Sequence, residues 1–255
     1  MLAGNSEGRV DPDGSLCSEF DGNSRLRQEA MFDSAIILIP AHDEAQSVAA
    51  VISEVSHRTD CHIVVIDDAS SDDTAEVARK AGATVLSLSV QLGAWGAVQT
   101  GMRFALQRGY RFVITMDADG QHEAADLGRL FAPVYEGQAD VSIGACTRRG
   151  SRMRKIAWVF LKWISGLSMD DITSGFRAYN RTALELLSGK DATLLEYQDI
   201  GVLAHLKRNN LTINEIQVNM CSRVSGHSRV YSSWLMVAYY MVQASILGFS
   251  KRSNR

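Results

Sequence analysis

Two carboxylates stand one residue apart in the stretch Thr115-Met-Asp-Ala-Asp-Gly-Gln-His122, directly after an apolar run. Alternate residues of a strand point to the same face, so Asp117 and Asp119 would share a side if the extended geometry continues. Hard oxygen ligands of this kind suit Mg²⁺ or Mn²⁺, and open α/β sheets bind ligands at the carboxyl ends of their strands. The pattern therefore predicts a site for a metal-bound diphosphate, with a solvated acidic turn as the plain alternative.

The sequence around this pair alternates between strand-like and helix-like patterns from residue 34 onward. Continuous apolar runs are typical of buried strands, and apolar residues at helical spacing are typical of amphipathic helices. The expected strands cover residues 35–39, 62–66, 84–88, 112–116, 141–144 and, at a sheet edge, 213–218. The expected helices cover residues 44–55, 70–81, 93–108, 126–135 and 196–207. Ser70 and Asp73 have the spacing of a capping box at the start of the second helix. Strands alternating with helices predict a Rossmann-like, three-layer α/β fold with a mostly parallel central sheet.

The composition is that of an ordinary globular protein. Of its 255 residues, 46% are hydrophobic and 22% are charged, enough for one large α/β domain or two small ones. The net charge of −3 provides no basic field, so we expect no nucleic-acid partner. The four cysteines are scattered without a C-x-x-C pair, which favours reduced thiols in a cytoplasmic protein over disulfides or a zinc site.

The two ends of the chain differ in character from its middle. Residues 1–33 are polar and rich in Gly, Ser, Asp and Asn, so we expect a disordered tail that lacks the apolar segment of a signal peptide. Residues 232–255 contain an apolar stretch from Trp234 to Phe249, followed by basic side chains. A helix that spans a bilayer needs about 20 apolar residues, so this shorter stretch is either a buried helix or an amphipathic helix in the membrane interface. The basic helical face expected over residues 152–163 favours the second alternative, peripheral attachment to a membrane.

Five motifs follow one another along the chain. They are Ile39-Pro-Ala-His-Asp-Glu44, Val65-Ile-Asp-Asp-Ala-Ser-Ser-Asp-Asp-Thr74, Gly93-Ala-Trp-Gly-Ala-Val-Gln-Thr-Gly101, Asp117-Ala-Asp-Gly-Gln-His122 and Asp171-Ile-Thr-Ser-Gly-Phe-Arg-Ala-Tyr179. Together they resemble the motifs of family 2 glycosyltransferases of the GT-A fold, and they look most like those of the dolichol- or polyprenyl-phosphate sugar transferases. The resemblance covers about residues 34–231 and implies one GT-A glycosyltransferase domain over that range.

The first two motifs are those that the resemblance assigns to the nucleotide. A strand that ends at Pro40 and opens a helix offers backbone donors to the base and ribose, so Pro40, Ala41 and Glu44 are expected to bind substrate. The family usually has Asn where this chain has Asp43. The second acid of the next motif, Asp68, is implied to contact the nucleobase, because a carboxylate accepts from a base N–H of uracil or guanine.

The third motif is a glycine-rich helix start. Gly93 and Gly96 allow close approach of the backbone to a phosphate at a helix N-terminus. Trp95 stands near the position where the family often has Lys, so one phosphate contact is lost or left to another residue.

In similar enzymes the fourth motif surrounds the metal and the diphosphate. The resemblance therefore implies that Asp117, Asp119 and Gln121 hold Mg²⁺ or Mn²⁺, with Asp119 counted among the catalytic residues. Asp199 lies where the family carries an acidic residue near the sugar. It is expected to act as a general base or to position the sugar hydroxyls. If the acceptor is a phosphate anion, no base is needed and Asp199 would only position the sugar.

Three arginines complete the expected site. Arg177, in the fifth motif, either contacts acceptor or phosphate or pairs with a carboxylate to support the structure. The sequence Arg223-Val-Ser-Gly-His-Ser228 resembles the family's R-x-x-G-x-S loop, and Arg229 follows it. The resemblance implies that Arg223 and Arg229 donate to phosphate oxygens.

The expected function is that of an inverting, metal-dependent glycosyltransferase. It would move a hexose from a UDP- or GDP-linked donor to a polyprenyl (dolichyl or undecaprenyl) phosphate at a membrane surface. One alternative is transfer to a hydroxyl of a growing polysaccharide or oligosaccharide, for which a base-like role of Asp199 becomes essential. Another is a non-catalytic nucleotide-sugar-binding partner of a membrane assembly.

Overall fold

The computed structural model describes residues 30–146, 174–193 and 200–221. Within these ranges, seven strands form one sheet in the order β3-β2-β1-β4-β6-β5-β7. The strands are β1 (Ala35–Ala41), β2 (His62–Asp67), β3 (Thr84–Ser87), β4 (Phe112–Thr115), β5 (Val141–Ala145), β6 (Arg177–Tyr179) and β7 (Ile213–Gln217). Of these, β6 runs antiparallel to its neighbours β4 and β5, and the other pairs are parallel. The expected mostly parallel sheet is confirmed, and β7 lies at an edge as its alternating sequence predicts.

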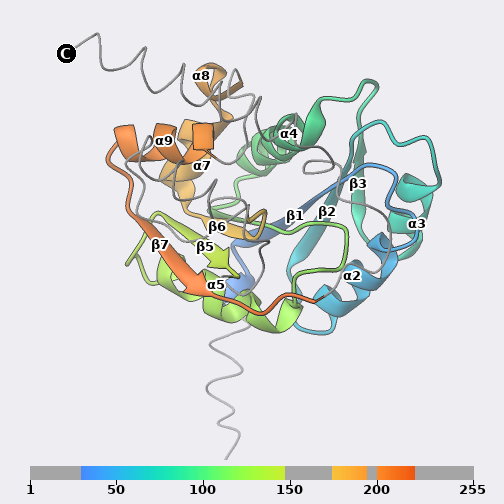
Figure 1. Cartoon of the computed structure of the whole chain (residues 1–255), viewed down its shortest axis with the longest axis horizontal. Helices are drawn as coiled ribbons and strands as arrows, with labels where there is room; N and C mark the ends of the chain where they lie inside the picture. The colour runs from blue at the N-terminus through green and yellow to red at the C-terminus, as the bar shows by residue number, and fades with distance from the viewer. Residues whose placement is uncertain (1–29, 147–173, 194–199, 222–255) are drawn as a thin grey trace, which may run out of the picture.

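Helices cover both faces of the sheet and make three layers (Figure 1). One face carries α2 (Val48–Ser56), α3 (Thr74–Lys80), the 3₁₀ turn η1 (Ala124–Asp126) and α5 (Leu127–Tyr135). The other carries α4 (Gly93–Gln107), α7 (Arg181–Ser188), α8 (Lys190–Thr193) and α9 (Ile200–Arg208). This is the three-layer α/β arrangement that the strand-helix alternation predicts.

Successive side chains of β1 enter the two cores in turn. Ile37 and Ile39 belong to one hydrophobic cluster, and Ile36 and Leu38 belong to the other. All four have no exposed surface. Because both faces of the strand are covered, its sequence is an unbroken apolar run rather than an alternating one.

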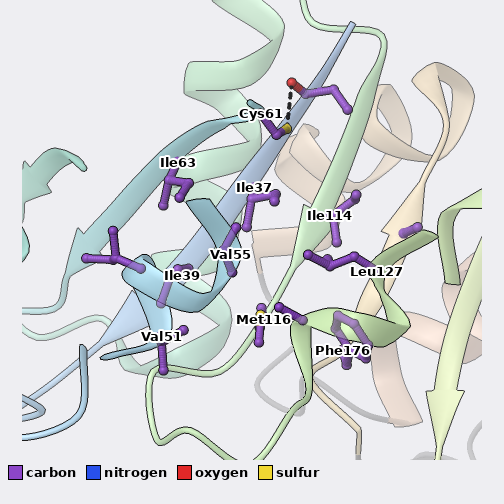
Figure 2. Close-up of a cluster of buried hydrophobic side chains, with 14 of the residues drawn as sticks. Ile37, Ile39, Val51, Val55, Cys61, Ile63, Ile114, Met116, Leu127 and Phe176 are labelled. Carbon is purple, nitrogen blue, oxygen red and sulfur yellow. Dashed lines mark hydrogen bonds between the residues drawn. The ribbon is translucent and has the colours of Figure 1, made fainter. Parts of the chain in front are cut away.

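Figure 2 shows the first of these cores, between the sheet and the helices α2 and α5. There the thiol of Cys61 donates to the carbonyl of Ala35 at 3.2 Å. Burial of the thiol raises the pKa of Cys61 to about 12. We therefore expect this cysteine to be chemically inert in the folded protein.

Some elements begin at residues other than those predicted. The helix expected from the Ser70–Asp73 capping box begins only at Thr74, and Asp73 makes no side-chain capping bond. The Ser70 hydroxyl instead accepts from the backbone N–H of Asp43. The helix expected over 44–55 begins at Val48. In both cases loop-to-loop hydrogen bonds compete with an early helix start.

The folded part of the chain begins before residue 34. Met31 and Phe32 are buried in the first core, and the ring of Phe32 lies 5.4 Å from that of Phe131. The expected tail over residues 1–33 therefore extends too far, since its last residues supply core side chains. Two apolar residues in a polar stretch are too few to show a hydrophobic period.

Several expected features fall outside the described residues. These are most of the N-terminal tail, the basic face of residues 152–163 and the apolar stretch of residues 234–249. In the part of the chain that is described, no helix has both the length and the hydropathy needed to span a bilayer.

Candidate active site

The first two motifs form a pair of loops at the carboxyl ends of β1 and β2, tied together by hydrogen bonds. Asp43 Oδ1 accepts from the backbone N–H and the hydroxyl of Ser71, at 2.8 and 3.0 Å. The backbone N–H of Glu44 donates to the Thr74 hydroxyl at 2.8 Å. Asp43 has a φ of +53°, a left-handed conformation that Asp and Asn adopt more readily than most residues. This backbone requirement accounts for an Asp at a position where the family usually has Asn.

These bonds fix the residues expected at the nucleotide. Pro40 and Ala41 are the last residues of β1, so they lie at the carboxyl edge of the sheet. The Glu44 carboxylate accepts from the Ser47 hydroxyl at 2.9 Å, close to the start of α2. The loop is therefore held by its own side chains before any ligand arrives, and its role in binding a nucleotide stays a prediction.

Asp68 has a structural role that its sequence motif does not reveal. Its carboxylate oxygens accept from the backbone N–H groups of Leu92 and Gly93, at 2.7 and 2.9 Å. These donors lie at the N-terminus of α4, where a negative charge is favourable. Asp68 is 3% exposed, so a contact with a nucleobase would use a lone pair that remains beside the two backbone bonds.

The same contacts bear on the phosphate site expected at the glycine-rich helix start. The Gly93 N–H that was expected to meet a phosphate already donates to Asp68. Gly93 has a φ of +77°, which explains the glycine without a ligand. At Gly96 a built Cβ would approach the side chain of Leu92, within the same helical segment. Local causes therefore explain both glycines: a left-handed backbone at Gly93 and the nearby Leu92 side chain at Gly96. Their expected contact with a phosphate stays a prediction.

Trp95 points away from this edge into the second core. The side chain is buried and its Nε1–H donates to the carbonyl of Ala192 at 2.8 Å. Gln99 and Arg103 continue the same row of α4 and donate to carbonyls at the end of α7, between Leu187 and Gly189. Trp95 thus serves the contact between α4 and α8, and it does not replace the missing lysine as a phosphate ligand.

The D-x-D loop follows β4 and contains the expected metal ligands. The side chain of Asp117 is 41% exposed, whereas Asp119 and Gln121 are buried. The backbone N–H of Gln121 donates to Asp119 Oδ1 at 3.1 Å, and its carbonyl accepts from the N–H of Cys221 at 2.9 Å. The loop is therefore braced by a bond of its own and tied to the segment at Cys221, and Asp117 is more exposed than Asp119.

The chemistry of the expected ligand atoms indicates which metal ion would fit. No three His, Cys, Asp or Glu side chains are grouped for a metal anywhere in the described ranges. The expected ligands are the carboxylates of Asp117 and Asp119 and the amide oxygen of Gln121, and their role as metal ligands stays a prediction. All of these are hard oxygen donors, which suits Mg²⁺ or Mn²⁺ in partnership with a diphosphate.

Two further residues border Asp117, and sequence reasoning did not assign them to the site. His122 Nε2 lies 3.0 Å from Asp117 Oδ2. A Cβ built on Gly175 would lie 2.3 Å from Asp117 Oδ1. Both residues belong to the quoted motifs, but His122 lacks a metal-ligand spacing and Gly175 is 58 positions along the chain from Asp117. Only the pairing of β6 with β4 brings that glycine to the loop.

Arg177, the first residue of β6, is 1% exposed. Its Nε donates to the carbonyl of Ser174 at 2.7 Å. This contact is to a backbone carbonyl and not to the expected carboxylate, and the expected acceptor or phosphate contact of Arg177 stays a prediction. Asp199, Arg223 and Arg229 lie outside the described residues, so their expected roles stay predictions.

Residues 36–186 match the family model described as glycosyl transferase family 2. The chain belongs to this family. A polyprenol monophosphomannose synthase of Mycolicibacterium smegmatis is 28% identical over 226 residues, which cover 81% of this chain and 84% of that protein. An undecaprenyl-phosphate mannosyltransferase of Micrococcus luteus is 28% identical over 215 residues, which cover 76% and 86%.

Solved structures support the fold of this family 2 glycosyltransferase. The glucosyl-3-phosphoglycerate synthase of Mycobacterium tuberculosis in complex with phosphoglyceric acid superimposes with a TM-score of 0.64 at 20% identity, covering 88% of this chain and 82% of the other. The same synthase has been solved with Mn²⁺ and UDP, at a TM-score of 0.66 and 19% identity, covering 89% and 81%. The predicted family and GT-A fold are thereby confirmed.

Proposed function

We propose that this family 2 glycosyltransferase transfers a hexose from a nucleotide-diphospho-sugar to a polyprenyl phosphate with inversion of the anomeric centre. The observation that carries the proposal is the hydrogen-bonded loop after β4, which contains Asp117, Asp119 and Gln121 and exposes the Asp117 carboxylate. The acceptor is taken from the relatives, because two of them are named for polyprenol monophosphomannose synthesis and undecaprenyl-phosphate mannosyl transfer.

The reaction is a single displacement. An oxygen of the acceptor phosphate attacks the anomeric carbon, and the bond from that carbon to the donor's β-phosphate oxygen breaks. The nucleoside diphosphate leaves from the opposite face, so an α-linked donor gives a β-linked product. A phosphate oxygen already carries negative charge, so no general base is needed and Asp199 would orient the substrate.

Asp117, Asp119 and Gln121 would hold a divalent metal ion together with the donor's diphosphate. Bound there, Mg²⁺ or Mn²⁺ would supply positive charge that stabilises the leaving diphosphate. The rest of the site would orient the donor. Asp68 would accept from the base with its remaining lone pair, next to the loop that Asp43 and Ser71 hold in place.

The proposal also concerns where the protein acts. A polyprenyl phosphate is confined to a membrane, so we place the enzyme at the cytoplasmic membrane surface as a peripheral protein. Cosedimentation with anionic lipid vesicles, compared between the full chain and a variant lacking residues 232–255, tests this placement. Equal binding of both proteins would exclude the C-terminal stretch as the attachment.

A transfer assay tests the function. Purified protein is incubated with Mn²⁺, a pool of radiolabelled UDP- and GDP-sugars and a short polyprenyl phosphate, with Asp119→Ala as the control. Label that reaches the organic phase only with the native protein supports the proposal, and dividing the pool identifies the donor. Donor binding without organic label would refute the acceptor and favour a saccharide hydroxyl or a binding role.

A further inference from the structure

His122 lies between the carboxylate of Asp117 and the aromatic ring of Phe176. Its side chain has no exposed surface, and its Nε2 lies 3.0 Å from Asp117 Oδ2. The His122 ring stacks on Phe176 with centroids 5.0 Å apart and an angle of 24° between the planes. A buried ring with a fixed orientation therefore contacts a carboxylate that reaches solvent.

The second ring nitrogen indicates which tautomer is present. Nδ1 of His122 is buried and has no hydrogen-bond partner within the described part of the chain. Burying an N–H without an acceptor costs about 1–3 kcal/mol, so the ring proton is better placed on Nε2, where Asp117 accepts it. In this tautomer His122 is a donor to Asp117 through Nε2, and Nδ1 carries the lone pair of the ring.

Gly175 borders the other oxygen of the same carboxylate. A Cβ built on this glycine would lie 2.3 Å from Oδ1 and 2.8 Å from Cγ of Asp117. Oδ1 therefore rests against the backbone at residue 175, while Oδ2 accepts from His122. The carboxylate is held from two sides by groups from different parts of the chain.

We propose that His122 is a positioning residue, which orients the Asp117 carboxylate toward the metal-bound diphosphate by donating its Nε2–H to Oδ2. The proposal rests on the proposed function, because it assumes that Asp117 binds the ion. His122 itself is no ligand in this scheme, since Nε2 is engaged and Nδ1 is buried. Groups that orient a metal ligand in this way change metal affinity or activity by about 10–100-fold when removed.

Three substitutions separate donation from packing. His122→Phe keeps an aromatic ring against Phe176 and removes the donor. His122→Gln places an amide N–H near the position of Nε2, whereas His122→Asn places its amide N–H near the position of Nδ1. The full-length proteins are titrated with Mn²⁺ in the presence of UDP or GDP, and free Mn²⁺ is measured by electron paramagnetic resonance.

We expect His122→Phe and His122→Asn to bind Mn²⁺ roughly 10–100-fold more weakly than the native protein, and His122→Gln to recover most of the loss. Unchanged Mn²⁺ affinity in both His122→Phe and His122→Asn would overturn the proposal. If the native protein binds no Mn²⁺ with either nucleotide, the proposed metal role fails instead. The melting temperature of each variant shows whether it remains folded.

A measurement on the metal-free protein provides an independent check. Nitrogen-15 spectra of histidine-labelled protein distinguish protonated from unprotonated ring nitrogens, and His122→Gln identifies the signals of His122 by their loss. We expect a proton on Nε2 and none on Nδ1. A proton on Nδ1 alone would refute the donation to Asp117, whatever the metal affinity.

Discussion

Replacing Gly175 with alanine places a methyl group against the Asp117 carboxylate. The new Cβ would start 2.3 Å from Oδ1, and Cβ atoms essentially never lie within 3.0 Å of a heavy atom outside their own and the adjoining residues. One of the two groups must therefore move by roughly 0.7 Å. The carbonyl of Gly175 accepts from the Thr115 hydroxyl at 2.7 Å, which ties this backbone to β4, and the φ of Gly175 is not left-handed. The carboxylate, which is 41% exposed, is the group with room to move.

The consequence should be large for turnover and small for stability. A displacement of about 1 Å at a catalytic group costs on the order of 100-fold in rate, so we expect Gly175→Ala to lower kcat/KM by about 10–100-fold. That loss equals roughly 1.4–2.7 kcal/mol of transition-state stabilisation. The free energy of unfolding should change by less than about 1 kcal/mol. Alanine restricts the unfolded backbone more than glycine does, and this stabilising effect offsets part of the cost of crowding in the folded protein.

Gly101→Ala is the matched control. Its built Cβ would lie 2.9 Å from the Cδ1 atoms of Ile66 and Leu38, in the second core and away from Asp117. Overpacking of the core costs about 1–3 kcal/mol of stability, and the better helix propensity of alanine returns up to about 1 kcal/mol. We therefore expect Gly101→Ala to be less stable than the native protein but to keep its kcat/KM. Urea denaturation and the transfer assay are run on both variants. Native kcat/KM in Gly175→Ala would refute the close support of Asp117.

Three other perturbations test the fold around the site. The free energy of unfolding, measured with urea, should fall by about 1.4 kcal/mol per pH unit as the pH rises above 9.0. The reason is that the unfolded Cys61 thiol loses its proton there, whereas the folded thiol keeps it up to a pKa of about 12. The Cys61→Ser variant keeps a hydrogen-bond donor but does not titrate, so it should lack this part of the pH dependence. Trp95→Lys should destabilise the protein by about 3 kcal/mol or more, since it buries a charge and leaves the Ala192 carbonyl unpaired. A melting temperature equal to or above that of the native protein would contradict the buried position of this side chain. Asp43→Asn should melt within a few degrees of the native protein. Asp43→Ala should lower the free energy of unfolding by about 1–3 kcal/mol, because alanine disfavours the left-handed backbone and loses the bonds to Ser71. Equal losses of stability in the two variants would contradict this account.

Local pattern was enough to predict most of the sheet. Strands such as β1 and β2 are buried on both faces, so their apolar runs are visible without any knowledge of the partners. β6 was not predicted, because its three residues form neither an apolar run nor an alternation of apolar and polar side chains. They are Arg177, Ala178 and Tyr179. The strand exists because β4 and β5 pair with it on both sides, and such long-range pairing leaves no local signal.

The site shows the same division between local and distant causes. The D-x-D loop was recognisable because its carboxylates are close together in sequence. The hydrogen-bond partners of Asp68 were not recognisable from the sequence, since Leu92 and Gly93 are 24 and 25 positions away. A motif shows that a carboxylate is required at a position, and it does not show whether a ligand or the backbone requires it.

This distinction separates the acidic residues of the site into two groups. Asp68 and Asp43 are engaged by backbone N–H groups, so removing either should disturb the loops before any ligand is considered. Asp117 is more exposed, and both the buried His122 and the backbone of Gly175 lie against it. A carboxylate held this way keeps its orientation without being removed from solvent. That combination suits the metal-binding role proposed for Asp117, because its oxygen atoms would be oriented by the protein and still be open to an ion from solvent.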